Sequence, residues 1–113
     1  MTDRKKFQAW VRWLRRKFRG ERPVRVSLVP QSVLPGDCGE CRPVEGANGT
    51  SYVVSIVDSM NKTMTRDTLW EEWSHYLRFH LPRCGDAAKH DEVYGAIFNF
   101  IKRSWADGDE DED

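Results

Sequence analysis

The chain has 113 residues, of which 39% are hydrophobic and 32% are charged, and its formal net charge is zero. This length allows one domain with a modest core, and the composition is that of a folded globular protein rather than a disordered or fibrous one. No apolar run approaches the roughly 20 residues that span a bilayer, and no apolar signal-peptide core follows the basic N-terminus. Three cysteines, an odd number, argue against a disulfide framework. We therefore expect a cytoplasmic protein.

The charges are unevenly distributed along the chain. The first twenty-five residues contain ten Lys or Arg and two acids, whereas residues 107–113 are acidic at every position except Gly108. Acidic runs of this kind are usually disordered and solvated. We predict a single domain over residues 1–106 and a disordered acidic tail over residues 107–113.

The N-terminal segment is predicted to form a basic amphipathic helix over about residues 4–19. Apolar residues recur there at helical spacing, and Gly20 and Pro23 end the pattern. Arginines surround the apolar face and form a candidate surface for an anionic partner such as nucleic acid, namely Arg12, Arg15, Arg16 and Arg19. The alternative is that the apolar face covers the sheet while the arginines are merely solvated, and both can hold at once.

Two strands are expected next, at residues 24–29 and 51–57. The first alternates as a half-buried strand, and the second is dense in β-branched and aromatic residues. Residues 30–50 between them are rich in Gly and Pro, which predicts a long turn or an irregular hairpin.

Two further helices complete the pattern. One begins with Thr65 as its expected N-cap and ends at Pro82, and the other runs from about residue 91 to 105. The order helix, strand, strand, helix, helix predicts the α+β class, with a small antiparallel sheet packed against the N-terminal, central and C-terminal helices.

Residues 71–75 read Glu-Glu-Trp-Ser-His, which is the zinc-peptidase motif HExxH with glutamate in place of the first histidine. In HExxH, both histidines lie on one face of a helix and bind the metal, and the glutamate acts as general base. Glu72 and His75 keep the positions of the base and the second ligand. A second motif follows fifteen residues after His75, with the sequence His90-Asp91-Glu92-Val93-Tyr94-Gly95.

Together these motifs resemble those of the small SprT-like, phage-borne zincin metallopeptidases, in which LxHEWAHAL precedes HDxxWG. The resemblance covers roughly residues 53–105 and rests on Leu69, Glu72, Trp73, Ser74, His75, Leu77, His90, Asp91, Tyr94 and Gly95. It implies a zincin-type active-site helix and a zinc-dependent hydrolase, with Glu72 as the catalytic base and His75 and His90 as metal ligands. It also implies a peptide or protein substrate, which we expect at the sheet edge near residues 51–57.

Glu71 departs from the family pattern, so its role is open. A carboxylate can ligate zinc, and a His₂Glu set is an accepted catalytic shell. An anionic ligand also weakens the Lewis acidity of the ion and favours harder divalent metals. The chain is therefore either a metallopeptidase in which Glu71 is the third ligand, or an inactive zincin-fold binding module that acts through its basic N-terminal helix.

A structural metal site is a further alternative. Cys38 and Cys41 have the spacing of half a zinc site, and His80 with Cys84 could complete a Cys₃His set. The two halves are far apart in the sequence, and a pair of reduced, packed thiols is the other interpretation. A zinc site here would make the chain a small interaction protein stabilised by metal.

Overall fold

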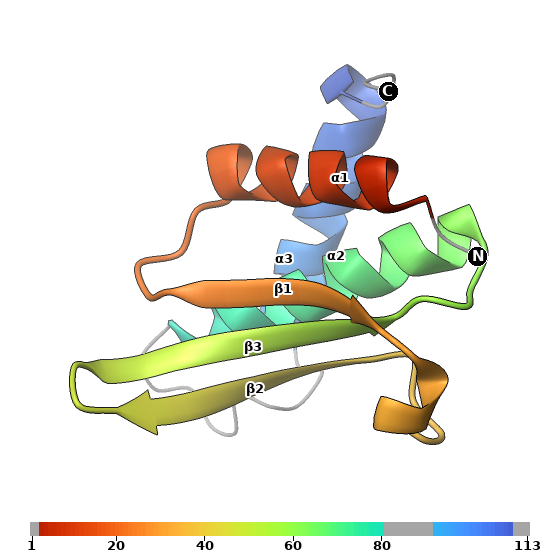
Figure 1. Cartoon of the computed structure of the whole chain (residues 1–113). Helices are drawn as coiled ribbons and strands as arrows, with labels where there is room; N and C mark the ends of the chain where they lie inside the picture. The colour runs from red at the N-terminus through yellow and green to blue at the C-terminus, as the bar shows by residue number, and fades with distance from the viewer. Residues whose placement is uncertain (1–2, 81–91, 110–113) are drawn as a thin grey trace.

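The computed structural model describes residues 3–80 and 92–109 (Figure 1). Within these ranges the elements follow in the order α1 (Arg4–Lys17), β1 (Val24–Val29), the short 3₁₀ helix η1 (Gln31–Val33), β2 (Gly39–Gly46), β3 (Gly49–Val57), α2 (Lys62–Phe79), α3 (Glu92–Ser104) and the π-helical turn η2 (Trp105–Asp109). The predicted α+β class is confirmed. Residues 107–109, the start of the predicted acidic tail, belong to η2.

The sheet has the strand order β1-β3-β2 and is mixed. β2 and β3 form an antiparallel hairpin, whereas β1 pairs parallel with β3, so the expectation of a purely antiparallel sheet is wrong. The parallel pair arises because the η1 segment reverses the chain before β2 and the hairpin turn reverses it again before β3. β3 is therefore the central strand, so residues 51–57 form no free edge, and the sheet edge nearest to them is β1 or β2.

One face of the sheet is covered by the helices (Figure 1). Alternate residues of β3 point toward them, and Tyr52, Val54 and Ile56 are all buried. β2 lies where the sequence suggested a turn, and its residues Gly39, Cys41 and Pro43 stand beside these three in the register. Glycine and proline interrupt the alternation of apolar and polar residues that predicts a strand, although both residues are tolerated in an edge strand.

Three tryptophans from three different elements form the centre of the helical layer. Trp13 of α1 lies 5.3 Å from Trp70 of α2 and 5.1 Å from Trp105 of η2, measured between ring centroids. Trp70 and Trp105 are 5.6 Å apart. Each ring contributes its buried area and each pair adds about 0.5–1.5 kcal/mol, so this cluster joins α1 and the end of α3 to α2.

The central helix α2 begins before its predicted N-cap. Asn61 Oδ1 accepts a hydrogen bond from the Met64 N–H at 2.9 Å, which makes Asn61 the N-cap. Thr65 instead lies buried in the first turn, and its hydroxyl donates to the Asn61 carbonyl at 2.8 Å. No helix in the described ranges is long and apolar enough to cross a membrane.

The segment between α1 and β1 is fastened to α2. The Trp73 indole N–H donates to the Phe18 carbonyl at 2.9 Å, and the Tyr76 hydroxyl donates to the Arg22 carbonyl. The Arg22 N–H in turn donates to His80 Nε2 at 3.1 Å. Gly20 lies directly against Tyr76, since a Cβ at this position would lie 2.6 Å from Tyr76 Cε2.

We predict that Gly20→Ala destabilises the fold by about 1–3 kcal/mol, because the Tyr76 ring cannot move away without losing its bond to Arg22. The matched control is Gly95→Ala in α3, where nothing among the described residues lies within 4 Å of the new Cβ. That change should stabilise the protein by about 0.5–1 kcal/mol through helix propensity. Urea unfolding measures both, and an equal effect at the two positions would contradict the packing described.

Candidate functional site

The first motif is carried by α2 into its interface with β2. Glu72 is half-buried there, beneath Gly39. A Cβ added at Gly39 would lie 3.2 Å from Glu72 Cγ and 2.7 Å from Thr68 Cγ2. The glycine therefore makes room for the Glu72 side chain between the helix and the edge strand. Sequence analysis missed this role, for which the signal is a glycine inside a strand that packs closely on another element.

The second motif meets the first through an aromatic contact. The His75 ring of α2 stacks on the Tyr94 ring of α3, with 4.4 Å between centroids and 28° between planes. Tyr94 is buried and stacks in turn on Phe98. The structure thus brings Glu72, His75 and Tyr94 to one junction of α2, β2 and α3. His90, the third residue that the resemblance implies, lies outside the described residues.

Negative charge is concentrated at this junction. The pKa of Glu72 is raised from its ordinary value of 4.5 to about 7, first by burial and then by the nearby carboxylates of Glu71, Glu40 and Asp37. Burial also raises the pKa of the Cys41 thiol to about 12, with further contributions from Glu72 and Glu40. Cys41 therefore stays protonated and is a poor nucleophile.

The phenol of Tyr94 responds to the same charges. Burial, followed by Glu71 and Glu72, raises its pKa well above the ordinary value of 10.0. Tyr94 thus keeps its proton throughout the physiological range. The site combines a carboxyl group that titrates near neutrality, an imidazole and a neutral phenol, which is the equipment of general acid–base chemistry.

The side chains at this junction are of types that bind divalent cations. Glu71 and His75 are four residues apart and lie on one side of α2, and the surrounding carboxylates would favour a positive ion. Among the described residues, no group of three or more His, Cys, Asp or Glu is arranged to hold a metal. Catalytic zinc takes three protein ligands, so His90 is needed to complete the set.

The structure gives less support to the alternative metal site at the cysteines. Cys38 is exposed, while Cys41 packs against the core. His80 already uses both ring nitrogens, since Nε2 accepts from the Arg22 N–H and Nδ1 lies 2.9 Å from the Tyr76 carbonyl oxygen. Cys84 lies outside the described residues.

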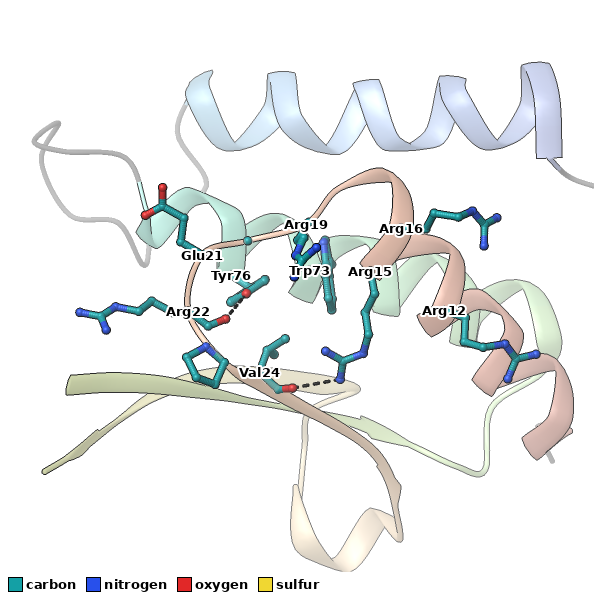
Figure 2. Close-up of a pocket in the computed structure, with 11 residues that line it drawn as sticks. Arg12, Arg15, Arg16, Arg19, Glu21, Arg22, Val24, Trp73 and Tyr76 are labelled. Atoms are coloured by element: carbon teal, nitrogen blue, oxygen red, sulfur yellow. Dashed lines mark hydrogen bonds between the residues drawn. The ribbon is translucent and has the colours of Figure 1, made fainter. Parts of the chain in front are cut away.

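The arginines of α1 lie around a separate cavity of about 670 Å³ (Figure 2). Its lining includes all four arginines of the predicted anionic-partner surface. Arg22, which sequence analysis did not single out, also contributes. Its place in this cavity depends on the bonds that fasten the segment after α1 to Tyr76 and His80, and a sequence pattern does not reveal these.

Comparisons with models of protein families, with curated proteins and with solved structures find no match to this chain. The resemblance to zincins therefore stands on the two short motifs. The contact between His75 and Tyr94 adds a spatial relation between them.

Glu72 should make the stability of the metal-free protein depend on pH. Its folded-state pKa of about 7 exceeds its ordinary value of 4.5, so the folded state binds more protons than the unfolded state between these values. The stabilisation is complete below pH 4.5 and is lost as the pH rises through about 7, by at most ~3 kcal/mol. We expect Glu72→Gln to remove most of this loss.

Urea unfolding at pH 5 and pH 8 in the presence of a chelator measures this effect. Glu45→Gln, a change to an exposed glutamate of β2, is the control and should behave as the wild type does. Identical pH dependence in Glu72→Gln and the wild type would contradict the burial of this carboxyl group.

Proposed function

We propose that this chain is a zincin-like, metal-dependent peptidase with an altered metal site. The observation that supports the proposal most strongly is the stacking of His75 on Tyr94, because it joins the two halves of the zincin motif pair, which are far apart in the sequence. This contact gives the two motifs a common location, at the junction of α2 and α3.

Glu71, His75 and His90 would hold the metal in this proposal. The bound ion would polarise the carbonyl of the peptide bond that is cleaved. Since Glu71 replaces a neutral imidazole by a carboxylate, the site should accept manganese more readily than a site with three histidines does.

Glu72 is the general base in this scheme. It takes a proton from the attacking water as the water oxygen bonds to the carbonyl carbon, and it then gives this proton to the amine that leaves when the C–N bond breaks. Its burial under Gly39 suits both steps, because a carboxyl group with a pKa of about 7 can accept and release a proton near neutrality.

The substrate would bind along the free edge of β2. The Cys38 carbonyl accepts a bond from the Val57 N–H at 2.9 Å, and main-chain groups alternate in direction along an antiparallel strand. The main-chain groups of Gly39 and Cys41 consequently face away from β3. An extended peptide that pairs with them would pass beside Glu72.

A second candidate is a binding module with the same fold and no turnover. The arginine-lined cavity beside α1 favours it, since this feature has no part in the proposed hydrolysis. The two candidates differ in what Glu72 does, and each can be tested separately.

We expect Glu72→Gln to lower the rate of peptide cleavage by about 10²–10⁴-fold while metal binding is retained. The assay is cleavage of unfolded casein, followed by mass spectrometry, with added zinc or manganese. Glu45→Gln, at an exposed position of β2, should leave the rate unchanged. Cleavage that survives in Glu72→Gln would contradict the assignment, and a wild type without cleavage would favour the binding module.

Restoring histidine at position 71 distinguishes a metal site that is altered from a metal site that has been lost. Glu71→His should increase zinc affinity by about tenfold or more, because a neutral imidazole completes a three-histidine set. Titration calorimetry with zinc measures the change. Unchanged affinity would place the metal away from Glu71.

A further inference from the structure

The cavity beside α1 is lined by positive side chains. Arg12, Arg15, Arg16 and Arg19 come from α1 and the residues that follow it, and Arg22 comes from the segment leading to β1. In Figure 2, Arg12 and Arg16 lie along α1 and Arg22 lies at the opposite end of the cavity. Four guanidinium groups, those of Arg12, Arg15, Arg16 and Arg19, thus line the cavity, whereas the Arg22 guanidinium extends away from it and lies against Gly49 at the β2–β3 turn.

Little negative charge offsets them. Glu21 is the acidic residue among those that line the cavity. Within the described part of the chain, none of the five arginines forms an ion pair. Clustered charges of one sign repel each other and destabilise the compact state. An anion bound among them would relieve this repulsion.

The walls of the cavity are held in place while most of the charged groups stay accessible. Arg15 donates to the Val24 carbonyl at 3.0 Å and lies over the Trp73 ring. The opposite wall is fixed because Tyr76 and His80 bond the main chain of Arg22. Arg15 and the other four arginines are all exposed. A ligand would meet a shaped, positively charged surface rather than a flexible tail.

The geometry points to a site for clustered phosphate groups, as carried by a nucleoside diphosphate or triphosphate. Guanidinium groups bind phosphate through paired hydrogen bonds, and the four of Arg12, Arg15, Arg16 and Arg19 exceed what one phosphate requires. The volume of about 670 Å³ lies in the range of pockets that hold a whole small ligand. Trp73 and Tyr76 are buried and their polar atoms bond the main chain, so they offer no exposed ring on which a base could stack.

Calorimetric titration of the full chain with inorganic phosphate, tripolyphosphate and hexathymidylate tests this site. Tripolyphosphate should bind about tenfold or more tightly than phosphate, because it engages several arginines at once. Hexathymidylate should bind more weakly than tripolyphosphate, because its sugars separate the phosphates. The site is independent of the proposed peptidase, and Glu72→Gln should bind tripolyphosphate as the wild type does.

The decisive variant is Arg16→Ala/Arg19→Ala, compared with Arg25→Ala/Arg42→Ala. The control removes the same charge from exposed positions on the sheet, away from this cavity. The cavity variant should weaken tripolyphosphate binding about tenfold or more, and the control should change it less than about twofold. Equal losses in both variants would overturn the site and indicate attraction by overall charge. Tighter binding of hexathymidylate would also overturn it, since this would identify an extended nucleic-acid surface.

Discussion

The packing of α2 between the sheet and the other helices is the constraint on which the rest of this structure depends. One side of α2 lies under β2 and β3, and Trp70 joins it to Trp13 and Trp105. Because so much of α2 is buried, its polar side chains must form hydrogen bonds or occupy space within the buried interfaces. Glu72 lies beneath Gly39, and Tyr76 bonds to the Arg22 carbonyl. Both candidate sites follow from these placements.

The two candidate sites use different residues of α2. At the junction with β2 and α3, burial and neighbouring carboxylates raise the pKa of Glu72 to about 7. At the junction with α1, Trp73 and Tyr76 use their polar atoms to hold a segment of main chain, and the charge is supplied by arginines from outside α2. Acidic and basic regions are thereby kept on separate sides of one element. This separation would allow the proposed anionic ligand and metal ion to bind without competing.

Much of the fold could be predicted from periodicity. The helix predicted over about residues 4–19 is found at Arg4–Lys17, and the two predicted strands are present. β2 was not predicted as a strand because Gly39, Pro43 and Gly46 interrupt its apolar alternation. The start of α2 was misplaced because Asn61 and Thr65 are both good N-cap residues, and the choice between them depends on the burial of Thr65. Tertiary packing decides such cases.

The candidate active site was predicted in part. The motif spacing identified Glu72, His75 and Tyr94, which the fold places together. The space under Gly39 and the high pKa of Cys41 could not be foreseen, since they depend on the register of a strand that the sequence did not reveal. Arg22 was missed for a similar reason, because main-chain hydrogen bonds to distant side chains position it.

Metal analysis of the purified, tag-free protein tests the central claim most directly. The wild type is compared with His75→Ala and with His80→Ala, which changes the other histidine at the end of α2. We predict about one divalent ion per chain in the wild type and in His80→Ala, and its loss in His75→Ala. Absence of metal from the wild type, or metal that persists in His75→Ala, would contradict the proposal that α2 carries a metal-dependent active site.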